Sequence, residues 1–184
     1  MRIVAGAWRG RTLLAPPGAT TRPTADRVRQ AVFDMLLHAP WGGRAVVEGA
    51  RVLDAFAGTG ALGLEALSRG ATHATFLERD RAALAALRAN IAACGAGDRA
   101  RVLAVDATHP PKSEAPCGMV FLDPPYREEL VPRALAALRE SGWIAPAALI
   151  VVETGESERL TETAAILATR THGAARITVW REGN

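Results

Sequence analysis

The chain has 184 residues, which is the size of one domain. It is 49% hydrophobic and 22% charged, and this mixture excludes a disordered chain. No apolar run reaches the roughly 18 residues of a membrane helix, and Met1–Gly6 lacks a signal-peptide core, so we expect a cytoplasmic protein. The two cysteines have no metal-ligand spacing, so we expect no bound metal.

The positive charge is concentrated at the front of the chain. Up to Arg44 the sequence holds seven arginines and two acids, whereas the remainder holds 15 basic and 17 acidic residues. A basic front on a near-neutral body favours a segment that binds a polyanion, although a solvated face without a partner would carry the same charges.

The first elements are a short hairpin and a helix. Residues 2–14 alternate loosely between apolar and polar types, which predicts a small basic β-hairpin within residues 1–20. The main domain is then expected over residues 21–184. From Thr24, a suitable N-cap, apolar residues recur at helical spacing until Pro40 ends the helix.

After this helix, strands alternate with helices. Strands are predicted over 51–56, 72–78, 100–105, 118–123 and 147–153, and helices over 61–69, 81–94 and 129–141. The ranges 165–171 and 175–181 flank Gly173 and predict a final antiparallel hairpin. The alternation predicts an α/β fold with a mostly parallel, Rossmann-like sheet, whose ligands bind at the carboxyl ends of its strands.

The first strand–helix turn carries a glycine motif. Gly58, Gly60 and Gly63 form GxGxxG, and Glu78 follows twenty residues after Gly58. This is formally a dinucleotide fingerprint, so a NAD(P) oxidoreductase is one interpretation. Asp54 argues against it, because a carboxylate at this turn would repel an anionic pyrophosphate.

S-adenosylmethionine (SAM) fits the same turn better, because its amino group and sulfonium are cationic. Asp54 would then hold the methionine part of the cofactor, Glu78 the ribose and Asp106 the adenine amine. The full set of predicted cofactor-binding residues is Asp54, Phe56, Gly58, Gly60, Glu78, Asp106 and Ala107.

A second motif, Asp-Pro-Pro-Tyr, follows the fourth predicted strand. Its prolines stiffen the loop, which presents the Asp123 carboxylate, the Pro124 carbonyl and the Tyr126 ring. Two acceptors suit the two N–H groups of a nucleobase amine, whose own lone pair is a poor nucleophile, and the ring suits stacking on the base. We therefore predict catalytic roles for Asp123, Pro124 and Tyr126. An unperturbed aspartate titrates near 3.9, so Asp123 is expected to be ionised at pH 7.

Together the two motifs resemble the amino-methyltransferases of nucleic acids. Three segments, Arg2–Arg11, Arg22–Arg29 and Asp54–Gly70, narrow the resemblance to the bacterial 16S rRNA guanine-N2 methyltransferases, the RsmD family. The resemblance implies a class I SAM-dependent methyltransferase sheet, methyl transfer to the N2 of a guanine with S-adenosylhomocysteine as product, and 16S rRNA or the small ribosomal subunit as partner. We take a monomer as the default.

The arginine-rich front is then expected to bind RNA phosphates. The predicted residues are Arg2, Arg9, Arg11, Arg22, Arg27 and Arg29. Three alternatives remain beside the guanine-N2 enzyme. The first is an N6-adenine methyltransferase acting on DNA or RNA, which would use the same Asp-Pro-Pro-Tyr motif. The second is a NAD(P) enzyme, which Asp54 and that motif disfavour, and the third is an RNA-binding module without catalysis.

Overall fold

The computed structural model describes residues 1–16, 23–125, 130–155, 160 and 165–183. Its α-helices are α1 (Pro23–His38), α2 (Ala61–Ser68), α3 (Arg81–Ala93) and α4 (Leu130–Glu140). Its strands are β1 (Arg51–Asp54), β2 (His73–Leu77), β3 (Ala100–Leu103), β4 (Cys117–Leu122), β5 (Ile144–Gly155), β6 (Ile166–His172) and β7 (Ala175–Arg181).

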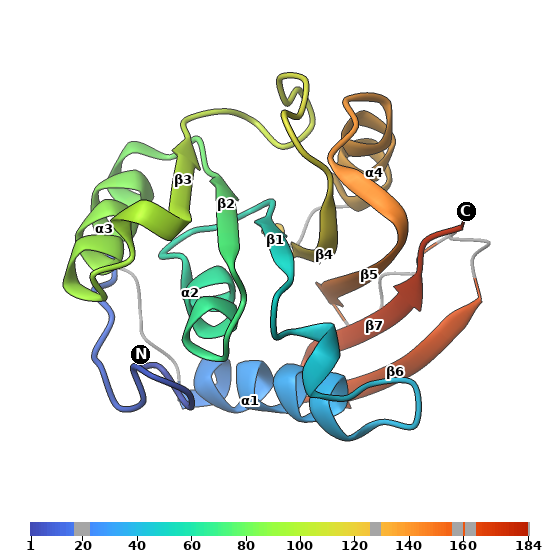
Figure 1. Cartoon of the computed structure of the whole chain (residues 1–184), viewed down its shortest axis with the longest axis horizontal. Helices are drawn as coiled ribbons and strands as arrows, with labels where there is room; N and C mark the ends of the chain where they lie inside the picture. Colours follow the sequence, from blue (N-terminus) through green and yellow to red (C-terminus); the bar gives the residue numbers. More distant parts are fainter. Residues whose placement is uncertain (17–22, 126–129, 156–159, 161–164, 184) are drawn as a thin grey trace.

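The strands form one seven-stranded sheet in the order β3-β2-β1-β4-β5-β7-β6 (Figure 1). The strands from β1 to β5 run parallel, while β7 pairs antiparallel with β5 and with β6. This confirms the predicted sheet with its C-terminal hairpin. Strand order reverses between β1 and β4, and in open α/β sheets this switch point is where a crevice for ligands forms.

Helices cover both faces of the sheet, as the alternation predicted. The first face buries apolar residues of α1, α2 and α3, and there the rings of Phe33 in α1 and Phe121 in β4 lie 5.7 Å apart. On the opposite face α4 packs with Trp143 and Trp180. The helices hold the strand ends in fixed positions, so the loops after β1, β2 and β4 are presented at one edge.

Most element boundaries differ from the sequence prediction by one or two residues, and the start of β5 differs by three. The first helix begins at Pro23, where a proline in the first turn costs no helical hydrogen bond. The strand predicted from Ala147 begins at Ile144. Its pairing with β4 shifts register near its start, and Ala147 has a φ of 58°, so an irregular stretch precedes the regular ladder.

The N-terminal hairpin is joined tightly to the domain. A single antiparallel bridge connects Arg2 with Thr12, and Ile3 is buried in the same core as α1 and α2. The backbone N–H groups of Ala7 and Trp8 donate to the carbonyl and the hydroxyl of Ser68 at the end of α2. The hairpin therefore has no core of its own and is held by the domain.

Gly6 allows this close approach. It has a φ of +83°, and a Cβ built on it would lie 1.9 Å from the carbonyl oxygen of Ser68. Any side chain at this position would both strain the backbone and push the hairpin away from α2.

Candidate cofactor and substrate site

The glycine turn between β1 and α2 depends on the small size of its residues. Gly58 and Gly60 have φ values of +53° and +81°. A Cβ on Gly60 would lie 2.4 Å from Cδ1 of Leu87, and one on Gly63 would lie 2.3 Å from the ring of Phe76. The start of α2 therefore packs directly on β2 and α3, and the backbone of the turn stays close to the strand ends.

Asp54 ends β1 and is buried beneath this turn. Its Oδ2 accepts a hydrogen bond of 2.9 Å from the backbone N–H of Gly63. Burial raises the pKa of Asp54 to about 7; the Gly63 bond opposes this rise, and the negative charge of Glu78 adds to it. Among the described residues no basic side chain forms an ion pair with Asp54, and this environment suits a cationic ligand.

Glu78 connects the glycine turn to the end of β2. Its Oε2 accepts from the backbone N–H of Gly58 at 2.8 Å, and its Oε1 accepts from the N–H groups of Arg79 and Asp80 at 2.7 Å each. A carboxylate oxygen accepts about two hydrogen bonds. Among the described contacts, Oε2 therefore keeps capacity for one more donor, such as a ribose hydroxyl.

Asp106 follows β3 and faces Glu78 across the strand ends. Its Oδ1 accepts from the backbone N–H and the hydroxyl of Thr108, both at 2.8 Å, and its Oδ2 accepts from Arg79 at 2.6 Å. The Thr108 backbone N–H, with smaller help from the Thr108 hydroxyl and Arg79, lowers the pKa of Asp106 although partial desolvation opposes it. Asp106 is therefore a fixed, ionised acceptor at the rim of the cleft.

A cavity of about 690 Å³ lies among these strand ends. Its size is within the range of cofactor pockets. Five of the seven predicted cofactor residues line it, namely Phe56, Gly58, Glu78, Asp106 and Ala107. Asp54 lines the neighbouring cavity instead, and Gly60 lines neither.

The neighbouring cavity has a volume of about 310 Å³ and lies against α1. Its walls combine apolar residues of α1 with carboxyl groups of the strand ends; they include Val28, Val32, Asp54, Asp123 and Glu153. Phe56, Gly58 and Asp123 line both cavities. The two cavities therefore meet at the aspartate of the Asp-Pro-Pro-Tyr motif.

Asp123 has an unusual environment for a carboxyl group reached by solvent. Water reaches it through the open cleft, but protein surrounds its other sides. This desolvation raises the pKa of Asp123 well above its usual range, and the charges of Glu153 and Asp54 raise it further. The ordinary pKa expected from sequence is therefore wrong for Asp123. Pro124 is buried behind it, and Tyr126 lies outside the described residues.

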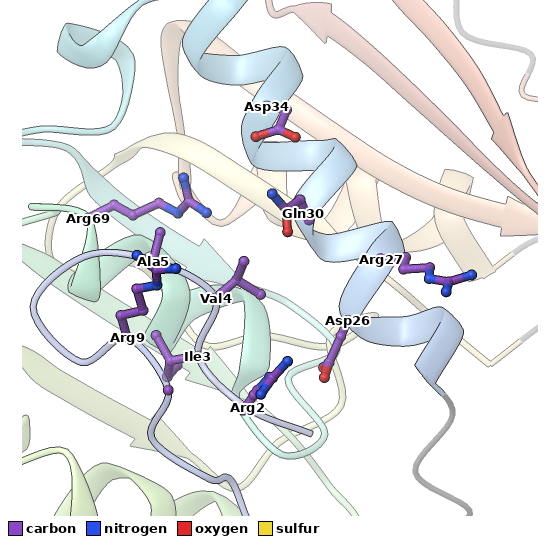
Figure 2. Close-up of a pocket in the computed structure, with 11 residues that line it drawn as sticks. Arg2, Ile3, Val4, Ala5, Arg9, Asp26, Arg27, Gln30, Asp34 and Arg69 are labelled. Atoms are coloured by element: carbon purple, nitrogen blue, oxygen red, sulfur yellow. The ribbon is translucent and has the colours of Figure 1, made fainter.

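A third cavity, of about 630 Å³, separates the hairpin from α1 (Figure 2). We call it the hairpin groove. Figure 2 shows Arg2 and Arg9 extending from the hairpin, Arg69 from α2, and two acids along α1. Three of the predicted RNA-binding arginines line the groove, namely Arg2, Arg9 and Arg27. Arg69, which the sequence did not single out, lines it as well.

Arg29 is a correction to the predicted RNA-binding set. It is 4% exposed, and its Nη2 donates to Asp26 at 2.9 Å and to the carbonyl of Arg2. Its Nε lies 3.5 Å from the buried Glu65. Because ion pairing with two carboxylates holds this guanidinium inside the protein, it cannot reach a phosphate. An arginine on the buried side of an amphipathic helix cannot be distinguished from its exposed neighbours by charge counting.

The other two predicted arginines lie elsewhere. Arg11 is exposed and donates to the carbonyl of Ala93 at the end of α3, away from the hairpin groove. Arg22 lies outside the described residues.

Sequence reasoning missed two side chains that fix the hairpin. Glu65 in α2 accepts from the backbone N–H groups of Val4 and Ala5 at 2.7 and 2.9 Å. Asn90 in α3 accepts from the N–H of Leu14 at 2.7 Å and donates to the carbonyl groups of Leu14 and Thr59 at 3.0 Å. Both side chains could have been noticed in the sequence, because each is a polar residue on the apolar face of its predicted helix.

Within the ranges that the structure describes, no group of three or more His, Cys, Asp or Glu side chains is arranged to hold a metal ion. Among the helices of those ranges, none has the length and apolar character required to cross a membrane.

The sheet order, the glycine turn and the cavity at the strand ends together define the fold of class I SAM-dependent methyltransferases. A solved structure of this class is the 16S rRNA N2 G1207 methyltransferase RsmC of Thermus thermophilus, in complex with AdoMet and guanosine. It superposes with a TM-score of 0.69 at 20% identity, covering 90% of this chain and 44% of that chain, and this likeness concerns the fold alone.

Closer relatives place the chain in a family. The model of the family described as Conserved hypothetical protein 95 matches residues 1–181, and the chain belongs to this family. Ribosomal RNA small subunit methyltransferase D of Escherichia coli K12 is 45% identical over 155 residues, covering 84% of this chain and 74% of that protein. The solved structure of yhhF from Escherichia coli has a TM-score of 0.85 at 39% identity, covering 100% of this chain and 98% of that chain. The predicted RsmD-family membership is confirmed.

Proposed function

We propose that this protein transfers a methyl group from SAM to the exocyclic N2 of a guanine in the 16S rRNA of the small ribosomal subunit, and that it acts in the cytoplasm. The observation that carries the proposal is the meeting of the two strand-end cavities at Asp123, with the buried Asp54 beside the glycine turn. The relationship to ribosomal RNA small subunit methyltransferase D supports the substrate.

The residues of the cleft suit SAM. Asp54 would bind the cationic amino group, because its carboxylate is buried, which raises its pKa to about 7, and forms no ion pair with another described residue. The backbone of Gly58 and Gly60 would approach the methionine part, the free capacity of Glu78 would accept a ribose hydroxyl, and Asp106 would face the adenine amine. When bound, SAM supplies an electrophilic methyl group attached to a sulfonium.

The second cavity suits the target base. Asp123, at the boundary between the cavities, would accept one N–H group of the guanine amine and so direct its lone pair. The carbonyl of Pro124, a buried residue that lines neither cavity, is assigned to the other N–H group on its place in the motif alone. Accepting these hydrogen bonds also stabilises the positive charge that develops on N2. The amine loses one proton in the reaction, and Asp123 can receive it because its raised pKa makes it a stronger base than a free aspartate. Tyr126 is assigned to stacking on the base.

The hairpin groove would bind the RNA backbone. Arg2, Arg9 and Arg27 bring positive charge to one surface depression. Arg69 also lines it but is only 10% exposed, pairs with the buried Glu65 at 2.8 Å and lies over the Phe33 ring, so it belongs to the floor of the groove. Arginine binds phosphate in two-pronged geometry, and such contacts provide affinity without sequence information. Enzymes of this kind act on bases that are unpaired or turned out of the stack, so the groove would hold the strand that flanks the target.

Transfer from tritiated SAM tests this function. Naked rRNA, small ribosomal subunits and duplex DNA are each incubated with the protein, and the product is digested to nucleosides. We expect labelled N2-methylguanosine from rRNA or subunits. Labelled N6-methyladenosine, or its deoxy form from DNA, would instead identify an N6-adenine methyltransferase. RNA binding without any transfer would indicate an RNA-binding module without catalysis.

A further inference from the structure

Two carboxylates stand side by side at the ends of neighbouring strands. In the parallel pair β4 and β5, Leu122 is in register with Val152, so the next residues, Asp123 and Glu153, lie next to each other. Leu122 and Val152 both belong to the core on the α4 face. Because side chains alternate along a strand, Asp123 and Glu153 both project to the opposite face, where α1 lies.

Both carboxylates line the cavity of about 310 Å³. Two apolar residues of α1 line it, Val28 at 5% and Val32 at 3% exposure. The cavity thus combines apolar side chains, against which a planar nucleobase could pack, with two acceptors at one end. Its volume is at the lower limit of small-ligand pockets.

The charges around this cavity favour a ligand that donates hydrogen bonds. Asp123 is faced by Glu153 from β5 and by Asp54 from β1, and both carboxylates disfavour its ionised form. From α1, Arg29 also lines the cavity, but Asp26 and Glu65 are its ion-pair partners. Among the described residues that line this cavity, three are acidic, against the Arg29 guanidinium and the N-terminal Met1: the acids are Asp54, Asp123 and Glu153.

Guanine matches two adjacent acceptors better than adenine does. Its N1–H and its N2 amine are neighbouring donors on one edge of the base. Adenine has an acceptor at N1, which would meet a carboxylate, a group that only accepts hydrogen bonds when ionised. A site built to pair with donors strongly rejects a base that lacks them, because its polar groups are left unpaired.

We propose that Glu153 is a specificity-determining residue that accepts a hydrogen bond from N1–H of the target guanine while Asp123 accepts from N2. This inference rests on the proposed function. Glu153 selects guanine and fixes the base edge, and it makes no contact with the cofactor's amino group, which belongs to Asp54.

The variant Glu153→Gln tests the proposal, with Glu48→Gln, an exposed glutamate far from the cleft, as the matched control. Substrate is small ribosomal subunits from cells that lack the endogenous modification. We expect kcat/KM for subunits to fall about 5- to 150-fold, the range for one good base contact, while Glu48→Gln stays within twofold. A kcat/KM within twofold of wild type for Glu153→Gln would overturn the proposal.

Two further readouts separate recognition from a structural effect. The Kd for SAM, measured by calorimetry, is expected to stay within twofold in Glu153→Gln, and a tenfold loss would instead assign Glu153 to the cofactor. Removal of the Glu153 charge should also move the acidic limb of the kcat profile to lower pH, because Asp123 then ionises more easily. A limb that stays in place contradicts the proposal. Glu153→Asp, which keeps the carboxylate, should recover part of the lost kcat/KM.

The outcomes also distinguish this proposal from the function on which it rests. If wild-type protein transfers no methyl group to guanosine, the proposed function fails. If wild-type protein does so and Glu153→Gln is equally active, the role of Glu153 alone fails.

Discussion

The charged residues that line the strand-end cleft are mainly acidic, whereas basic residues outnumber acidic ones in the hairpin groove. The cleft presents carboxylates from five neighbouring strands or the loops that follow them, whereas four arginines line the groove: Asp54, Glu78, Asp106, Asp123 and Glu153 on one side, and Arg2, Arg9, Arg27 and Arg69 on the other. Under the proposed function this separation matches a cationic cofactor and an anionic RNA.

The charged side chains of the cleft are more buried than those of the groove, so their electrostatic effects differ in size. In the cleft, desolvation raises the pKa of Asp54 to about 7 and raises that of Asp123 as well. In the groove, the charges are of both signs, because Asp26 and Asp34 also line it. Cleft charges should therefore have large, specific effects, while groove charges should have smaller effects that salt screens.

Hydrogen bonds link the two regions. Asn90 bonds to Leu14, where the hairpin ends, and to Thr59 in the glycine turn. The hydroxyl of Thr59 also approaches the sulfur of Met1 at 3.4 Å. The hairpin and the glycine turn therefore share their supports, and a variant that displaces one will disturb the other.

The largest effect is expected from Asp123→Ala, which removes an acceptor from the meeting point of the two cavities. Transfer should fall roughly 10²–10³-fold, by analogy with loss of one preorganised oxyanion-hole donor, while SAM binding is retained. Rates are measured with tritiated SAM and small subunits, and Asp98→Ala, at an exposed position, serves as control. Transfer at near wild-type rate would remove the catalytic role from Asp123.

A second large effect is expected from Asp54→Asn, which keeps the shape of the side chain and removes its charge. SAM binding should weaken by about 1.5–3 kcal/mol, the contribution of a charge-assisted hydrogen bond. Calorimetry measures this change, and NADH titrated into wild-type protein is expected to give no binding heat. An unchanged Kd for SAM, or binding of NADH, would contradict the role of the cleft as a cation site.

The pKa of Asp54 predicts how the affinity for SAM depends on pH. Below about pH 7 the free protein holds Asp54 protonated, so a cation that binds its ionised form must release that proton. The association constant should rise as pH increases from 5.5 to 7 and then level off. Titrations in two buffers with different ionisation enthalpies count the released proton, and Asp54→Asn should bind with no such release. Equal proton release by both proteins would assign it to another group.

The smallest effect is expected in the hairpin groove. Replacing Arg2 and Arg9 together by Gln should weaken RNA binding and flatten the plot of log affinity against log salt by about 0.7 per lost contact on single-stranded RNA. The Kd for SAM should barely change. Arg44→Gln, whose side chain is 84% exposed, is the control. If the melting temperature falls while the salt slope stays unchanged, the two arginines serve stability.

The sequence predicted the fold well because its signals are local. The turn at Gly58 and Gly60, the helical spacing after Thr24 and the hairpin around Gly173 each depend on a few neighbouring residues. The irregular start of β5 was missed because it arises from pairing with β4, a neighbour distant in the sequence.

The site was predicted less completely, and for a related reason. Strand order brings Asp54, Asp123 and Glu153 together, and only the register of β4 with β5 places Glu153 beside Asp123. The burial of Arg29 likewise depends on Glu65 and on the carbonyl of Arg2, which lie in separate segments. Charge counting cannot anticipate such contacts.

Steady-state transfer measured side by side for the cleft variant and the groove variant decides whether the two regions bind different parts of the substrate complex. Small subunits and SAM are varied for Asp123→Ala and for the Arg2→Gln, Arg9→Gln double variant. We expect the cleft variant to lose kcat at saturating substrate. The groove variant is expected to keep kcat and to raise the KM for subunits. If both variants change the same kinetic parameter, the division into a cofactor-and-base cleft and an RNA-binding groove is wrong.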